Sequence, residues 1–163
     1  MRKLALVLSS LILCVTISAA KDKISSQWKC EAKPVDDHSI AVPDQEGHAY
    51  HIGQGKCPSE NGTMGGVKEQ EGTYTEFGDV AGNTVANHGM FVVTLASGDK
   101  VFYNYHGTQT VKDGAVQSGT NTWTLTGGTG KMKGVKGSGR CKGKGNPDGS
   151  STWNCDGTYS TGP

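Results

Sequence analysis

Residues 136–160 read KGSGRCKGKGNPDGSSTWNCDGTYS, and they predict one β-hairpin together with its register. Pro147-Asp148-Gly149 is typical of a three-residue loop, in which a type I turn ends on a glycine in the left-handed region. When the two residues that flank this loop stand opposite each other, Cys141 falls opposite Cys155. Turn chemistry and cysteine spacing therefore indicate the same register independently. We expect a Cys141–Cys155 disulfide, which closes a loop of about 15 residues and contributes about 3 kcal/mol in the chain-entropy account.

One face of this hairpin combines glycines with aromatic rings. Three glycines of the first strand share the face of Cys141. In this register Gly137 stands opposite Tyr159, Gly139 opposite Gly157, and Gly143 opposite Trp153. Glycines leave room for rings, an arrangement suited to the interior of a tight barrel. The other face carries Arg140, Lys142 and Lys144 opposite polar residues, so we expect it to lie in water.

Most of the remaining chain alternates in character between turn signals. It holds 25 glycines and shows almost no helical periodicity, which favours an antiparallel sheet, sandwich or barrel. Gly119–Thr126 alternates cleanly and places Trp123 on its buried face. By contrast, Lys21–Asp44 is expected to be an irregular arm with a short strand near Trp28–Ala32.

The two most apolar predicted strands are His88–Ala96 and Lys100–Thr108. Between them, Gly98-Asp99 suits a two-residue type II′ turn. That register divides the side chains into two faces: Phe91, Val93, Leu95, Phe102, Asn104 and His106 on one, and Met90, Val92, Thr94, Ala96, Val101, Tyr103 and Tyr105 on the other. Both faces are substantially apolar, and the sequence leaves open which one points inward. The outer face would need a cover, either the N-terminal arm or another subunit.

Gly127–Gly137, with the sequence GGTGKMKGVKG, resembles the signature turn of the allene oxide cyclase and dirigent families. The resemblance implies a closed, calycin-like antiparallel β-barrel of about eight strands, often oligomeric, with a central cavity for small hydrophobic ligands. Plant members guide cyclisation or radical coupling without a cofactor. This chain departs from the family in its cysteines, and no cyclase residues can be matched one for one. The resemblance therefore bears on the fold far more than on an activity.

The first 20 residues have the three parts of a secretory signal: early cations, an apolar run and small residues before a cleavage site after Ala20. We therefore expect a single barrel domain over 21–163, secreted or periplasmic, with no membrane segment after signal removal. An even number of cysteines remains, which predicts two disulfides. Cys30–Cys57 follows by elimination. The net charge of +1 indicates no general affinity for nucleic acid.

Five residues are candidates for a ligand site inside the barrel: Asn104, His106, Tyr74, Glu76 and Trp123. If the face of Asn104 and His106 points inward, these polar groups would orient a ligand. His106 or Glu76 could also move a proton. The alternative is that neighbouring backbone satisfies Asn104 and His106, or that the register is inverted. No spacing of histidines, cysteines and carboxylates predicts a metal site, and no motif predicts a cofactor.

Three functions remain open from the sequence. The first is a non-enzymatic barrel that binds a small apolar ligand or a partner, with a homo-oligomer as one expected form. The second is a cofactor-free cyclase or isomerase that uses the barrel cavity. The third is a surface protein that binds an anionic polymer through the basic run Lys131–Lys144. That run lacks the interleaved aromatics of nucleic-acid readers, which favours a merely solvated strand face.

Overall fold

The computed structural model describes residues 21–161, so the predicted signal segment lies outside the described residues. The described chain forms strands and one short 3₁₀ helix: β1 (Asp22–Cys30), β2 (Asp36–Ala41), β3 (His48–Asn61), β4 (Thr63–Met64), β5 (Val67–Ala81), β6 (Thr84–Leu95), β7 (Lys100–Lys112), β8 (Ala115–Gly128), η1 (Gly130–Met132), β9 (Lys136–Gly145) and β10 (Ser151–Ser160). No helix in this part of the chain is long and apolar enough to cross a membrane.

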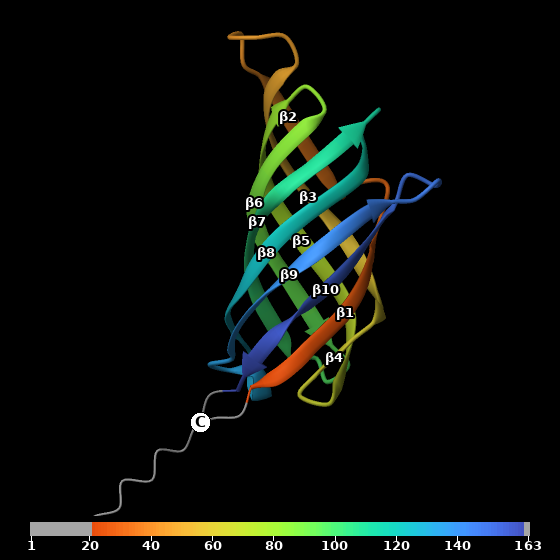
Figure 1. The fold of residues 1–163 in the computed structure, drawn as a ribbon. Helices are drawn as coiled ribbons and strands as arrows, with labels where there is room; N and C mark the ends of the chain where they lie inside the picture. Colours follow the sequence, from red (N-terminus) through yellow and green to blue (C-terminus); the bar gives the residue numbers. More distant parts are fainter. Residues whose placement is uncertain (1–20, 162–163) are drawn as a thin grey trace, which may run out of the picture.

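The strands close into an antiparallel barrel (Figure 1). From β5 to β10, each strand pairs with the next in sequence, and β10 then pairs with β1. The circuit closes because β3 pairs with both β1 and β5. Eight strands form this circuit, while β2 extends one edge of β3 and β4 adds a short pairing to β5. The predicted closed barrel of about eight strands is confirmed.

The N-terminal segment corrects the sequence expectation. Lys21–Asp44 was expected to be irregular, yet β1 is a full barrel strand and β2 continues along the same partner, β3. In β1 the buried positions are Ile24, Ser26 and Trp28. The serine among them hides the alternation of apolar and polar residues that identifies a strand in the sequence.

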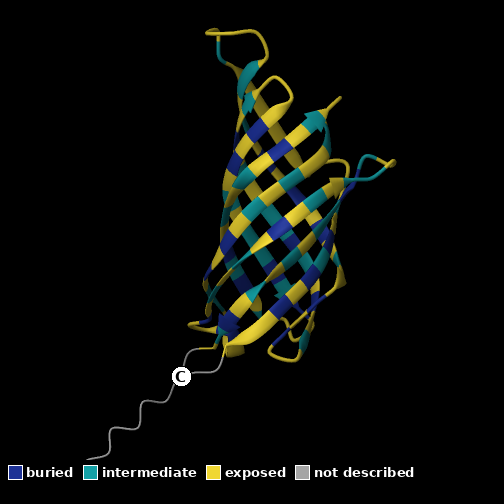
Figure 2. Ribbon diagram, viewed as in Figure 1, coloured by how far each residue is buried: buried dark blue, intermediate teal, exposed yellow. Residues whose placement is uncertain are grey.

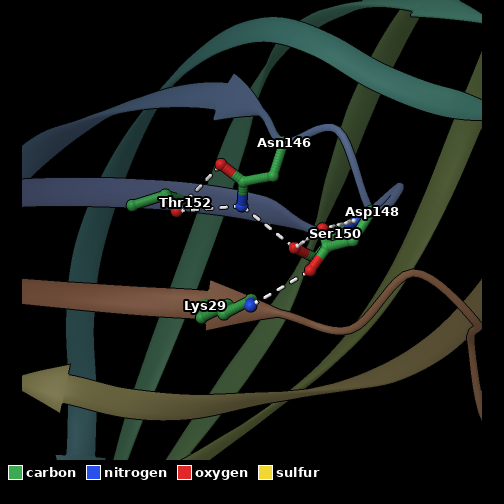
Figure 3. Close-up of polar contacts among 5 residues, drawn as sticks. All are labelled: Lys29, Asn146, Asp148, Ser150 and Thr152. Atoms are coloured by element: carbon green, nitrogen blue, oxygen red, sulfur yellow. Dashed lines mark hydrogen bonds and ion pairs between the residues drawn. The ribbon is translucent and has the colours of Figure 1, made fainter.

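The last hairpin forms as predicted. The amide of Gly149 donates to the carbonyl of Asn146 at 3.0 Å, and the positive φ of Gly149 (82°) completes the three-residue loop. Figure 3 shows how polar side chains hold this turn: Asn146 donates to Ser150 and Thr152, and Ser150 donates to Asp148. The Ser150 contacts and Lys29, whose ammonium lies 3.1 Å from Asp148, lower the pKa of that carboxyl to about 2.

Both predicted disulfides are present. Cys141 pairs directly with Cys155 across the hairpin, and Cys30 is bonded to Cys57, which joins β1 to β3. The β1–β3 seam has only two residue pairs with a shifted register between them. The Cys30–Cys57 bond therefore reinforces the seam that has the fewest backbone pairings in the barrel circuit.

The β6–β7 hairpin differs from its prediction in both its loop and its register. The amide of Gly98 donates to the carbonyl of Leu95, and Gly98 has a φ of 85°, so the loop is Ala96-Ser97-Gly98 and not the two residues Gly98-Asp99. Phe91 consequently stands opposite Tyr103, not His106. Because neighbouring strand residues point to opposite faces, this shift turns Asn104 and His106 to the exposed outer face and brings Tyr103 and Tyr105 inside.

Packed side chains close one end of the barrel. Along the strands, buried and exposed positions alternate (Figure 2). The residues at this floor are 0 to 4% exposed: Met64, Val93, Leu95, Val101, Leu125, Met132 and Val135. Met132 belongs to η1, within the Gly127–Gly137 segment, and its side chain lies close to Gly65 and Gly128. The glycine-rich turn therefore contributes Met132, one of the buried side chains that close this end of the barrel.

Glycines inside the barrel make room for aromatic rings, as predicted for the last hairpin. A Cβ on Gly139 would lie 2.2 Å from the Trp123 ring and 2.1 Å from the carbonyl oxygen of Asp156. A Cβ on Gly157 would lie 2.5 Å from the Trp123 ring, and a Cβ on Gly143 would lie 2.6 Å from the Trp153 ring. The rings can therefore approach the backbone this closely only because these three positions are glycines without a side chain.

This packing predicts that Gly139→Ala destabilises the protein. The added methyl group meets a ring and a fixed carbonyl, so we expect a loss of about 1–3 kcal/mol, the usual cost of overpacking. Urea denaturation followed by tryptophan fluorescence measures it. Ser138→Ala, on the exposed face of the same strand, is the matched control and should change stability by less than about 0.5 kcal/mol. Equal, small effects at both positions would contradict the packing described here.

Candidate functional site

A cavity of about 340 Å³ lies above the floor, inside the barrel. Its wall contains four rings in successive edge-to-face contacts, contributed by β1, β6, β7 and β8. Centroid distances are 5.0 Å from Trp28 to Phe91, 6.2 Å from Phe91 to Tyr103 and 5.4 Å from Tyr103 to Trp123. Residues of the opposite barrel end line it too, among them Val111, Gly114 and Val116 beside the β7–β8 turn. A volume near 300 Å³ is the lower end of the range for small-molecule sites.

Glu76 is the centre of the main polar cluster in this wall. It projects inward from β5, and its Oε2 accepts hydrogen bonds from Tyr105 Oη and Asn87 Nδ2, both at 2.8 Å. Gln109 Nε2 lies 3.5 Å from Oε1. The three donors come from β6 and β7, the two strands that follow β5 in the barrel. The carboxylate is therefore held in place by neutral side chains on neighbouring strands.

Two further acids line the cavity, Glu31 and Asp37. Asp37 Oδ1 lies 2.9 Å from Nδ1 of His51, which also lines the cavity. Burial, followed by the charges of Glu76, Asp37 and Glu31, raises the pKa of Tyr74 to about 12. Burial and the charge of Glu76 likewise raise the pKa of Tyr105 far above its usual range. Both phenols are therefore protonated at neutral pH.

Several buried polar atoms of the lining have no hydrogen-bond partner among the described residues. They are Asn87 Oδ1, Asn121 Oδ1 and Trp123 Nε1. Buried polar groups in folded proteins nearly always have a partner, because an unpaired one costs about 1–3 kcal/mol. The residues that carry these atoms belong to the cavity lining.

The structure brings together three of the five predicted site residues. Tyr74, Glu76 and Trp123 line the cavity, whereas Asn104 and His106 lie on the outer face, where His106 Nε2 is 3.0 Å from Thr122 Oγ1. The structure follows the alternative in which the register is inverted for Asn104 and His106, because the β6–β7 loop is Ala96-Ser97-Gly98 and not Gly98-Asp99.

The sequence reasoning missed Asn87, Tyr105 and Gln109, the three partners of Glu76. All three occupy inward positions of the β6–β7 pair. A three-residue loop ending at Gly98, the same type as the one ending at Gly149, would have placed Tyr105 and Gln109 inside. The signal was therefore in the sequence, in the glycine at the last loop position.

The exterior of β8 and β9 shows no concentration of aromatic residues beside its cations. The basic residues of the run Lys131–Lys144 are all exposed, and Arg140, Lys142 and Lys144 stand opposite Asp156, Asn154 and Thr152. Within residues 21–161, no group of three or more histidine, cysteine, aspartate or glutamate side chains is placed to hold a metal ion.

Comparisons with known proteins give a likeness to several solved structures, two of them dirigent proteins. No family model matches the sequence, and no curated protein matches it. The pterocarpan synthase dirigent protein GePTS1 aligns with 97% of this chain and all of its own, at 12% identity and a TM-score of 0.49. The pterocarpan synthase dirigent protein PsPTS1 aligns with 88% of this chain and 97% of its own, at the same identity and TM-score.

The fold of this chain is established without this likeness. The barrel itself follows from the closed circuit of strand pairings.

Proposed function

We propose that this protein binds a small apolar ligand inside its barrel, without catalysis, in a compartment outside the cytoplasm. The observation that carries the proposal is the aromatic-walled cavity of about 340 Å³ with unpaired polar atoms in its lining. Ligand sites typically combine apolar walls with a few polar groups that fix orientation. The two disulfides are compatible with an oxidising compartment.

A cofactor-free isomerase is the second candidate, and Glu76 is the observation that favours it. With His106 outside the barrel, Glu76 is the remaining proton-handling candidate from the sequence, and it lies in the cavity beside the Tyr105 hydroxyl. Its hydrogen bonds to three donors hold the carboxylate in one orientation, which suits a ligand contact as well as proton transfer. Binding is common to both candidates, so it is the property to test first.

The test uses N-phenyl-1-naphthylamine, a neutral apolar probe that fluoresces when it leaves water. We expect saturable binding to the wild-type protein. Val111→Trp fills the end of the cavity beside the β7–β8 turn and should weaken the affinity at least about tenfold, because a ring there excludes the probe. Val116→Trp, on the facing residue of β8, should do the same and guards against misfolding of one variant.

Lys112→Trp is the matched control, since Lys112 is adjacent to Val111 but exposed. It should leave the affinity unchanged. The absence of probe binding to the wild type, or equal binding to all four proteins, would contradict the proposed site. Native mass spectrometry of the gently purified protein would show whether a ligand is retained from the expressing cell.

A further inference from the structure

The charge of the cavity lining is one-sided. Three acids belong to it, the exposed Glu31 and Asp37 and the half-buried Glu76, against a single basic side chain, His51. Within residues 21–161, the lining includes no lysine or arginine. The chain as a whole is nearly neutral, with 16 basic and 15 acidic residues, so this imbalance is local to the cavity.

Glu76 has hydrogen bonds but no positive partner. Its donors are a phenol and two amides, which orient the carboxylate without cancelling its charge. None of the ion pairs among the described residues includes Glu76. A partly buried carboxylate beside aromatic rings attracts a cation more strongly than a fully exposed one does.

The aromatic wall adds to this preference. The faces of tryptophan, tyrosine and phenylalanine rings carry negative electrostatic potential and attract cations within about 6 Å. Trp28, Tyr103 and Trp123 line the same cavity as Glu76. Rings and carboxylates therefore favour the same sign of charge in the ligand.

Two of the unpaired buried atoms are acceptors that fit an N–H donor. Asn87 uses its Nδ2 on Glu76, which leaves its Oδ1 free of described partners, and Asn121 Oδ1 is free in the same way. Asn87 is 6% exposed, so its amide lies inside the barrel and not at the surface. A protonated amine can donate to such oxygens while its charge faces Glu76.

We propose that the ligand is an organic cation, a protonated amine that carries one aromatic or apolar group. This inference rests on the proposed function, that the cavity binds a small ligand, and it adds the charge of that ligand. The apolar group would pack against the ring wall, and the ammonium would lie by Glu76. The cavity volume of about 340 Å³ is at the lower end of the range for small-molecule sites, so the ligand is small.

The experiment compares three probes that share a phenyl ring and differ in charge: 2-phenylethylammonium, 2-phenylethanol and phenylacetate. Isothermal titration calorimetry or displacement of N-phenyl-1-naphthylamine gives each affinity near neutral pH. We expect the ammonium to bind at least about tenfold more tightly than the alcohol, and phenylacetate to bind most weakly.

Glu76→Gln removes the charge while keeping the shape of the side chain. It should weaken ammonium binding about tenfold and change alcohol binding less than about twofold. Asp37→Asn, at a half-exposed acid, gives a second and less disruptive reduction of charge in the lining. Glu71→Gln is the matched control, because Glu71 lies on the same strand but pairs with Lys56 outside the cavity lining.

The experiment distinguishes a failure of the charge inference from a failure of the proposed function. If N-phenyl-1-naphthylamine binds but the ammonium has no advantage over the alcohol, or keeps its advantage in both Glu76→Gln and Asp37→Asn, the charge inference is overturned and the proposed function stands. If neither the neutral fluorescent probe nor any phenyl probe binds, the proposed function is overturned, and the charge inference with it.

Discussion

Replacing Glu69 by glutamine is expected to stabilise the protein by about 3 kcal/mol at alkaline pH and to leave it nearly unchanged at acid pH. Glu69 is fully buried at the floor of the barrel, and neither carboxylate oxygen has a hydrogen-bond partner among the described residues. Burial raises the pKa of this carboxyl from 4.5 to about 7, and the neighbouring Ser26 hydroxyl lowers it in part.

The sign follows from which state holds the proton. Below about pH 4.5 the carboxyl is protonated in both the folded and the unfolded chain, so it contributes no pH dependence. Between about pH 4.5 and 7 the unfolded chain loses this proton more readily, so the free energy of unfolding falls as pH rises. Above about pH 7 the folded protein carries a buried charge, and the full cost is present. Glutamine removes that cost because it stays neutral.

Urea denaturation of the wild type and Glu69→Gln from about pH 4 to pH 8 measures the difference. Taking the difference between the two proteins cancels other groups that titrate in this window, such as His48, whose pKa is raised chiefly by its contact with Asp44. Glu71→Gln, on the same strand but paired with Lys56 outside, should show no comparable pH-dependent gap. A gap for Glu69→Gln that does not grow with pH would contradict the burial of an unpaired carboxyl.

Trp123→Ala is expected to lower the free energy of unfolding by about 3–5 kcal/mol, the range for removing a large buried ring. Trp123 is 4% exposed and packs edge-to-face on Tyr103. Its ring also fills the space that Gly139 and Gly157 leave on the facing strands. No smaller side chain can reach both glycines, so the truncation leaves a cavity that the rigid sheet cannot close.

Trp123→Phe separates packing from hydrogen bonding. The indole Nε1 has no partner among the described residues, so phenylalanine loses ring volume but no protein hydrogen bond. We expect a loss clearly smaller than that of alanine, measured by chemical denaturation followed by circular dichroism. Equal losses for phenylalanine and alanine, or a loss under about 1 kcal/mol for alanine, would contradict the close packing of this ring against the glycines.

The C-terminal hairpin could be predicted because two independent constraints agreed. The loop residues Pro147-Asp148-Gly149 and the spacing of Cys141 and Cys155 each indicate one register, and the structure has it. For the β6–β7 hairpin, the loop residues were the only sequence feature that indicated a register. The sequence Ala96-Ser97-Gly98-Asp99 fits both a two-residue loop that begins with Gly98 and a three-residue loop that ends with it. The two loops differ in register by three positions, an odd number, so the change exchanges the two faces.

The burial of Glu69 could not be predicted from the sequence, for a different reason. On β5 the inward residues Gly72, Tyr74 and Glu76 have even numbers, and simple alternation would place Glu69 outside. A register shift between Glu69 and Glu71 reverses the pattern and buries the carboxyl. Nothing local in the sequence marks that bulge, so the buried acid could be found only from the structure.

The central claim is that small apolar molecules bind inside the barrel and not on its surface. An apolar probe could instead bind on the outer face of β3 and β5, where Ile52 and Phe77 form an exposed apolar pair. Intermolecular nuclear Overhauser effects from the phenyl ring of 2-phenylethylammonium locate the probe directly in the labelled protein. We predict contacts to the ring protons of Trp28, Tyr103 and Trp123. Contacts confined to Ile52 and Phe77, with the interior rings unaffected, would contradict the claim.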